Sequence, residues 1–264
     1  MFLSSGGIYF MSLFDFFSIG ISGYLTSDKF GLSEGWTIAV MISAALICIV
    51  APYLLGSMNF AIIISKKRYK ADIRSFGSGN AGATNMMRTF GKAAAGLTFL
   101  GDALKAFVSG MIGYAAMGQY GVYIAGLFCI LGHMFPVYYK FKGGKGVVTA
   151  AISILMCNPL VFLILFVIFV LIVLATRYIS LASVMCMLLY PVVLDRIEKL
   201  LNGATGAYVI IALINAVLVI FMHRENIKRL IQGKENKFSF KKSVKAEDKK
   251  AENTADVKVN DKDE

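Results

Sequence analysis

Long runs of apolar residues, separated by short polar segments, make up most of the chain between residues 36 and 222. These runs are continuous rather than alternating, and several approach the ~20 residues that a helix needs to cross a bilayer. Backbone polar groups in lipid must be satisfied within helices or a closed barrel, and the strands of a barrel would alternate apolar and polar positions. The pattern therefore predicts an all-α polytopic integral membrane protein with about seven transmembrane helices.

Seven apolar runs are candidate spans, and polar or glycine-rich residues separate them. They cover residues 36–65, 93–117, 120–139, 146–157, 159–176, 178–194 and 205–222. The run 146–157 is short for a full crossing. Either the glycines before it extend that helix, or the segment is partly re-entrant.

The two ends of the chain differ in character from its middle. Residues 1–35 are mildly hydrophobic and have no basic residue before Lys29, which argues against a signal peptide. We expect a weakly structured or interfacial extension there, followed by a transmembrane domain over residues 36–235. Residues 236–264 are rich in lysine and acidic residues and hold too little apolar surface to fold alone, so they predict a disordered charged tail.

Composition supports a membrane protein, because 57% of the residues are hydrophobic and only 16% are charged. Soluble domains hold about 45–50% apolar and about 25% charged residues. The net charge of +11 does not indicate nucleic-acid binding here, because basic residues gather in alternate loops, as the positive-inside rule describes. This distribution predicts an outside N-terminus and a cytoplasmic C-terminus, with every glycine-rich polar segment on the cytoplasmic face.

The first glycine-rich polar segment, FGSGNAGATNMMRTFGK, covers residues 76–92. Its glycines allow positive φ angles, its successive amides can form an anion-binding nest before a helix N-terminus, and Arg88 offers a bidentate grip on phosphate. The formal G-x-G-x-x-G match does not indicate dinucleotide binding, because a membrane helix precedes it instead of a strand. The alternative is an ordinary glycine-rich turn. The phosphate-binding candidates are Gly77, Ser78, Gly79, Asn80, Thr84, Asn85 and Arg88.

The second segment, GHMFPVYYKFKGGKGVVT, covers residues 132–149. It is not a Walker A motif, because the spaced upstream glycine and the hydroxyl residue after the lysine are missing. It is another amide-rich loop that holds a cation and opens a helix, which makes Gly143, Gly144, Lys145 and Gly146 further candidates for anion binding. We interpret His133, at a helix end, as structural.

A third polar group is divided between TRYISLAS (176–183) and HRENIKRLIQGKE (223–235). His223 and Asn226 are three residues apart, so they share one face of a helix. Ser180 and Ser183 have the same spacing. Their hydroxyls either bond a neighbouring helix or contact a substrate.

One pair of ionisable residues lies inside an apolar run. Asp102 and Lys105 fall within the span 93–117, where an unpaired charge would cost several kcal/mol. Their i,i+3 spacing allows mutual neutralisation. We predict an internal ion pair that supports the site.

Together, the polar segments indicate a substrate that carries phosphate and has a lipidic portion. The four cysteines lie in or beside apolar runs without metal-ligand spacing, and we find no paired carboxylates or nucleotide motif. Two other classes remain open. One is a transporter or channel for an anionic phosphate-bearing metabolite, against which the lack of evident inverted repeats argues mildly. The other is a non-catalytic membrane subunit with a basic face.

The segments GSGNAGATNMMRTFGK, GHMFPVYYKFKGGKGVVTA and HRENIKRLIQGKE resemble the three signature segments of the bacterial acyl-phosphate:glycerol-3-phosphate acyltransferase family (PlsY). The resemblance runs from about residue 38 to residue 236. One departure is YLLGSMNF (53–60), where the family usually has a proline near Asn59. This departure concerns the local helix geometry rather than the activity.

The resemblance implies transfer of a fatty acyl group from acyl phosphate, not acyl-CoA, to the 1-hydroxyl of sn-glycerol 3-phosphate, giving lysophosphatidic acid and inorganic phosphate. It implies no cofactor and no metal. The implied catalytic residues are His223, Asn226 and Ser78, and the candidates named above, with Ser180 and Ser183, would bind the substrates. Glu235 matches an acidic position to which we assign a structural role. The implied partners are the bilayer of the bacterial plasma membrane and, as a candidate, the soluble enzyme that supplies acyl phosphate.

Overall fold

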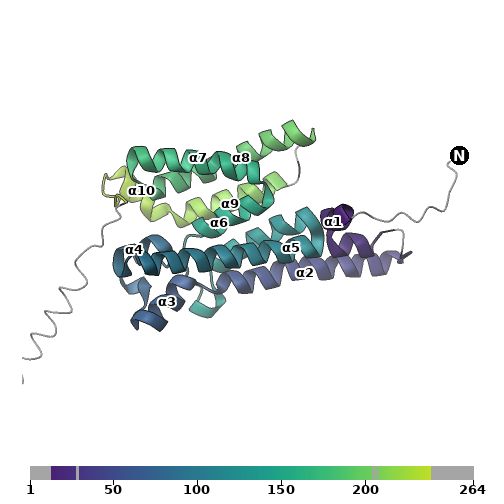
Figure 1. Cartoon of the computed structure of the whole chain (residues 1–264), viewed down its shortest axis with the longest axis horizontal. Coiled ribbons are helices and arrows are strands. Elements are labelled where there is room, and N and C mark those ends of the chain that lie inside the picture. The colour runs from purple at the N-terminus through teal and green to yellow at the C-terminus, as the bar shows by residue number, and fades with distance from the viewer. Residues whose placement is uncertain (1–12, 28–29, 204–205, 207, 239–264) are drawn as a thin grey trace, which may run out of the picture.

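The computed structural model describes residues 13–27, 30–203, 206 and 208–238, and the described part of the chain is helical. The α-helices are α1 (Leu13–Leu25), α2 (Glu34–Ser57), α3 (Phe60–Tyr69), α4 (Ala83–Phe90), α5 (Lys92–Met134), α6 (Val147–Cys157), α7 (Pro159–Thr176), α8 (Ile179–Asn202), α9 (Tyr208–Met222) and α10 (Arg224–Ile231). Two short 3₁₀ helices, η1 (Ile73–Ser75) and η2 (Val137–Tyr139), lie in the loops. Figure 1 shows α2 and α5 side by side, α7, α8 and α9 in a second group, and α6 between them.

Helix α5 is a hairpin of two antiparallel halves. Met117 and Gly118 interrupt it with non-helical backbone angles, and Gly118 has a φ of 58°. The side chains of Lys105 and His133 meet at 2.8 Å, whereas the 28 residues between them would span about 42 Å in a straight helix. The predicted runs 93–117 and 120–139 therefore correspond to the two halves of this hairpin.

Close approach of backbones brings α2 against α5. A Cβ on Gly56 would collide with the carbonyl oxygen of Cys129, and one on Gly132 would collide with that of Tyr53. Small residues at such contacts are typical of helix pairs in membranes, where packing and hydrogen bonding replace the hydrophobic effect as the force that joins helices.

The apolar helices confirm a helical membrane protein. Within the described residues, four helical stretches are long and apolar enough to cross a bilayer: Glu34–Tyr69, Lys92–Tyr139, Pro159–Thr176 and Ile179–Leu201. Helices α9 and α10 form a fifth if the pair, bent by 59°, counts as one span. Helix α6 is shorter, as the sequence predicts, and it ends where Asn158 caps α7.

The segment 53–60 contains the break between α2 and α3, which falls at Met58 and Asn59. Asn59 caps α3, because its Oδ1 accepts a hydrogen bond of 3.1 Å from the amide of Ile62. Its Nδ2 donates to the carbonyl of Ala81 at 3.2 Å. An amide side chain here thus ties α3 to the first glycine-rich segment.

The N-terminal stretch contains helix α1, which packs on α5. Gly20 lies against the turn of the α5 hairpin with a φ of 70°, and a Cβ there would collide with the amide of Gly118. The predicted weakly structured extension falls partly on residues 1–12 and 28–29, and most of the predicted disordered tail falls on 239–264. Both of these parts lie outside the described residues.

The predicted ion pair between Asp102 and Lys105 is confirmed. The Lys105 Nζ lies 2.9 Å from the Asp102 Oδ1, and both side chains are at most 3% exposed. The same ammonium donates to the carbonyls of Gly56 and Met58 at 2.9 and 3.0 Å and to the Nδ1 of His133. One buried charge thereby joins the end of α2 to both halves of α5.

This network predicts an asymmetric response to substitution. Asp102→Ala leaves a buried ammonium without its counter-charge, which costs about 3–5 kcal/mol. The double variant with Lys105→Met removes both charges and is expected to unfold at a higher temperature than Asp102→Ala alone. Thermal unfolding of the detergent-purified proteins measures this, and equal or greater damage in the double variant would contradict it.

Candidate active site

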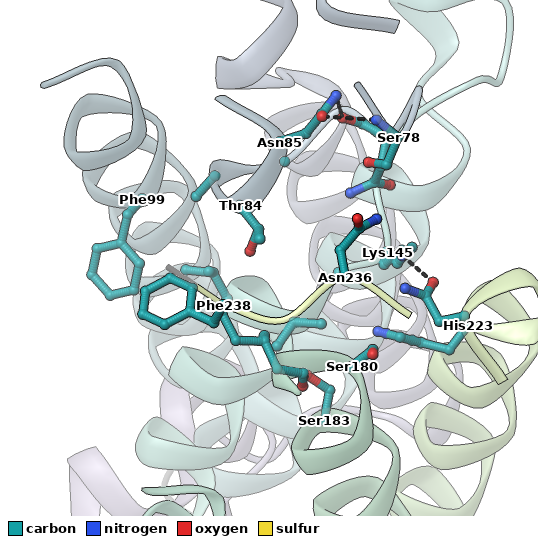
Figure 2. Close-up of a pocket in the computed structure, with 18 of the residues that line it drawn as sticks. Ser78, Thr84, Asn85, Phe99, Lys145, Ser180, Ser183, His223, Asn236 and Phe238 are labelled. Carbon is teal, nitrogen blue, oxygen red and sulfur yellow. Dashed lines mark hydrogen bonds between the residues drawn. The ribbon is translucent and has the colours of Figure 1, made fainter. Parts of the chain in front are cut away.

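Five segments that are distant in the sequence line one cavity of about 310 Å³ at the end of the bundle where α4 and α10 lie (Figures 1 and 2). They are residues 78–88, 145–148, 179–183, 223–226 and 235–238. Phe99, Asp102 and His133 of α5 and Phe169 of α7 complete the lining. The structure thus brings the three polar groups of the sequence together. Ser78, Asn80, Arg88, Lys145, Ser180, Ser183, His223 and Asn226 all line this cavity.

Four helices direct their N-termini at the cavity. The first residues of α4, α6 and α8 line it, as does His223, the N-cap of α10. None of these four N-termini is capped by a side-chain hydrogen bond. The first amides of a helix have no partner within the helix and carry the positive end of its dipole. Such ends bind phosphate, and here four of them converge.

The first glycine-rich loop is shaped by one side chain. The Oδ1 of Asn85 accepts from the amide of Ser78 at 3.0 Å, and its Nδ2 donates to the carbonyls of Phe76 and Asn80 at 2.9 and 3.0 Å. The amide of Gly79 donates to the carbonyl of Phe76 at 2.9 Å. The amides of Ser78 and Gly79 therefore bond within the loop, whereas the N-terminus of α4 lies at the cavity.

Gly77, Gly79 and Asn85 form the frame of this loop. Gly77 has a φ of 57°, and a Cβ there would collide with the Asn85 Oδ1. Thr84 and Arg88 follow on α4 and line the cavity. Arg88 is partly buried, and burial lowers the pKa of its guanidinium, which the charge of Glu235 partly offsets.

The second glycine-rich loop is pressed against the end of α5. The amides of Gly143 and Gly144 donate to the carbonyls of Met134 and His133, both at 3.1 Å. A Cβ on Gly144 would collide with the Nε2 of His133. These two amides are therefore used within the protein, although the sequence made both glycines candidates for anion binding. Lys145 and Gly146 are the residues of this loop that line the cavity.

Lys145 is a partly buried cation with an amide partner. Its Nζ donates to the Oδ1 of Asn226. Burial lowers the pKa of Lys145 to about 8, the nearby charges of Arg229 and Arg88 act in the same direction, and Glu235 opposes them. An anion in the cavity would add a further counter-charge and favour the protonated form.

His223 is held in one tautomer. Its Nδ1 lies 2.7 Å from the carbonyl oxygen of Val219. A carbonyl only accepts, so Nδ1 carries the proton and Nε2 of the neutral ring is left as an acceptor. Figure 2 shows the ring directed into the cavity, and only 2% of the residue is exposed.

Glu235 gathers the third polar group. Its Oε1 accepts from Ser180 Oγ at 2.9 Å and from Asn226 Nδ2 at 2.7 Å, and its Oε2 accepts from Arg229 Nε at 2.8 Å. Ser183 instead donates to the carbonyl of Ile179 on its own helix at 2.9 Å. Both serines thus have partners within the protein while lining the cavity, and the structural role expected for Glu235 fits these bonds.

A second, apolar cavity of about 220 Å³ adjoins the first between α6, α7 and α8. The two share Phe99, Val147, Val148, Phe169 and Ser183 as lining residues. Deeper residues of the apolar cavity include Ile152, Phe162 and Met187. The combined space has a cationic end and an apolar end, so it fits a molecule with the same division.

Sequence reasoning missed several lining residues. Phe169, Asn236 and Phe238 lie outside any recognised pattern, and Asp102 and His133 reach the cavity although they were interpreted as supporting residues. Phe99 also lines it, and its place three residues before Asp102, on the same helical face, is the signal that could have identified it.

Comparison with known proteins places the chain in a family. The family model described as "Glycerol-3-phosphate acyltransferase" matches residues 46–233. A glycerol-3-phosphate acyltransferase of Syntrophomonas wolfei is 44% identical over 189 residues, covering 72% of this chain and 94% of that protein. One from Thermoanaerobacter pseudethanolicus is 42% identical over 202 residues, covering 76% and 99%.

Solved structures agree with these relatives. The crystal structure of PlsY (YgiH), an integral membrane glycerol 3-phosphate acyltransferase, matches in its glycerol 3-phosphate form with a TM-score of 0.67 and 38% identity, over 74% of this chain and 96% of that one. Its lysophosphatidic acid form matches with a TM-score of 0.64 and 36% identity, over the same shares. These matches are acyltransferases, which favours an enzyme over the transporter or channel that the sequence left open. The chain is therefore a member of the PlsY-type family of integral membrane glycerol-3-phosphate acyltransferases.

Proposed function

We propose that this protein transfers a fatty acyl group from acyl phosphate to the 1-hydroxyl of sn-glycerol 3-phosphate. The observation that carries the proposal is the union of a cationic cavity, surrounded by four helix N-termini, with an apolar cavity between α6, α7 and α8. Phosphate groups fit the first space and an acyl chain fits the second. The two substrate-related forms of the PlsY crystal structure support the same acceptor and product.

The reaction requires little covalent chemistry from the protein. The glycerol oxygen attacks the acyl carbon, an ester bond forms, and the bond from the acyl carbon to the phosphate oxygen breaks. Acyl phosphate is already activated, so the main tasks are to hold two anions together and to stabilise the charge that develops. We assign the anion contacts to Arg88, Lys145 and the N-termini of α4 and α6.

The hydroxyl proton needs an acceptor. We assign this role to the Nε2 of His223, whose orientation is fixed by Val219. The phosphate of either substrate is the other possible acceptor, in which case His223 would orient the hydroxyl. Asn226 bonds Lys145 and would position it. We assign contacts with substrate oxygens to Ser78 and Ser180, which line the cavity from opposite sides.

We infer that the chain crosses the bilayer seven times, with α2, the two halves of α5, and α6 to α9 as the spans. The N-terminus would then lie outside, and the cavity would face the cytoplasm. The cluster of exposed cations that ends α3, including Lys66 and Lys67, supports this orientation. The setting that fits is a bacterial plasma membrane. Residues 36–235 would form the catalytic domain. The soluble enzyme that supplies acyl phosphate would approach from the same side.

Anion contacts are tested by release of inorganic phosphate from acyl phosphate in the presence of glycerol 3-phosphate. Arg88→Ala and Lys145→Ala are each expected to lower kcat/KM by about 30- to 160-fold, since each removes a charge-assisted bond worth roughly 2–3 kcal/mol. Lys67→Ala is the matched control, because this exposed lysine lies on the same face but outside the cavity. Near-normal turnover in both cavity variants would contradict the assignment, and acyl-CoA is expected not to replace acyl phosphate.

The pH dependence follows from Lys145. Only the protonated amine attracts an anion, and its pKa in the free enzyme is about 8. Burial lowers the pKa of His223, the assigned base, to about 4. We therefore expect kcat/KM to be level between about pH 4 and pH 8 and to fall as the pH rises through about 8. Lys145→Arg keeps its charge at every accessible pH, so this limb should move to higher pH in that variant. An unchanged alkaline limb in Lys145→Arg would assign it to another group.

Direct transfer predicts that no acyl group is bound to the protein. When the enzyme is given donor labelled in its acyl chain, without acceptor, and the reaction is then quenched, we expect no stoichiometric label on the protein.

His223→Ala should lower kcat by about 10²- to 10⁴-fold if the imidazole accepts the proton. A smaller loss would assign the proton to phosphate, and a labelled side chain would overturn direct transfer.

A further inference from the structure

The chain turns back across the cavity after α10. Gly233, with a φ of 66°, follows the helix, and the amide of Lys234 bonds the carbonyl of Arg229 at 2.8 Å. Residues 234–238, which we call the strap, then run over the cavity, as Figure 2 shows. The family match ends at residue 233. The strap therefore lies beyond the matched region but forms part of the site.

Two anchors hold the strap on the turn between α7 and α8. The first is the buried carboxylate of Glu235, which is 5% exposed and bonds Ser180 at the start of α8. The second is the amide of Phe238, which donates to the carbonyl of Arg177 at 2.7 Å. Because the second anchor uses the backbone, it does not depend on which side chain stands at residue 238.

Extended backbone alternates the sides on which its side chains lie. Asn236 and Phe238 line the cavity, whereas the Nζ of Lys237 lies over the ring of Tyr178, 6.0 Å from its centre. The strap thus presents an amide and an aromatic ring to the cavity. An aromatic ring is not a phosphate ligand, so Phe238 must serve another part of the substrate.

Phe238 stands near the junction of the polar and apolar cavities. Figure 2 shows its ring on the same side of the cavity as Phe99, and Phe99 lines both spaces. An acyl phosphate whose chain fills the apolar cavity and whose phosphate meets the cations must place its reacting carbonyl carbon at this junction. The ring of Phe238 is then the cover over that carbon on the strap side.

We propose that Phe238 is a specificity-determining residue that keeps water from the acyl carbon, so that the glycerol hydroxyl is the nucleophile that reacts. This inference rests on the proposed function. The competing reaction is hydrolysis, in which a water oxygen attacks the same carbon, the same bond to phosphate breaks, and free fatty acid and inorganic phosphate result. Exclusion of water from a reactive intermediate or substrate is a recognised task of segments that cover an active site.

The test compares two products from one purified, full-length protein in detergent. Phosphate release without glycerol 3-phosphate measures hydrolysis, and lysophosphatidic acid formed with it measures transfer. Phe238→Ala is expected to raise the ratio of hydrolysis to transfer by about tenfold, because it opens a path for water while leaving the backbone anchor in place. Phe238→Leu, which restores an apolar cover, should return the ratio most of the way to that of the unaltered protein.

Phe221→Ala is the matched control. Phe221 is 56% exposed on α9, its ring lies under Arg224, and it lines neither cavity. We expect this variant to keep the original ratio. An unchanged ratio in Phe238→Ala, or the same rise in both variants, would overturn the inference. If Phe238→Ala does not fold, Phe238→Ser is compared with Phe238→Leu and Phe238→Tyr. A tenfold rise of the ratio in Phe238→Ser, with equal ratios in Phe238→Leu and Phe238→Tyr, supports the role of the ring as a cover. No rise in Phe238→Ser overturns the inference. Absence of transfer in the unaltered protein would instead refute the proposed function.

Discussion

The rest of the architecture depends on the interactions of one buried group, the ammonium of Lys105. It is paired with Asp102, and it also bonds two carbonyls at the end of α2 and the ring of His133. An ion of this kind is tolerated in a membrane only when its partners are fixed around it. His133 in turn accepts the amide of Gly144 on its carbonyl and packs its ring against that glycine. The position of Lys145, one residue later, is thus set by a charge inside the bilayer.

The proposed binding of anions in the cavity uses a different means from the one that glycine-rich loops suggest. In both loops the glycines permit close packing, and most of their amides bond within the protein. The positive potential comes from helix N-termini and from Arg88 and Lys145, which burial keeps poorly solvated. Fixed dipoles and desolvated cations need little reorganisation when charge moves during a reaction. This arrangement suits a reaction that brings two phosphates together.

Much of this could be predicted from sequence, because hydrophobic runs and i,i+3 spacings are local properties. The apolar helices, the Asp102–Lys105 pair and the convergence of three polar groups follow from them. The hydrogen bonds that the loop amides make within the protein could not be predicted. They depend on Asn85 and on the end of α5, which contact the loops only in the folded chain. The strap was missed for a similar reason. Residues 236–238 look like the start of a charged tail, and only the contacts of Glu235 and Phe238 with the α7–α8 turn distinguish them.

The junction between the two cavities joins a polar space and an apolar space within one site. In the proposed reaction, glycerol 3-phosphate would reach it from water, where its supply is a bulk concentration. The acyl donor would reach it from the lipid, where its supply is a mole fraction within a surface. Adding inert lipid or detergent at a constant amount of donor would lower the mole fraction of the donor and leave the concentration of glycerol 3-phosphate in water unchanged. Rates for such a protein are therefore properties of the enzyme together with its membrane, and the two Michaelis constants carry different units.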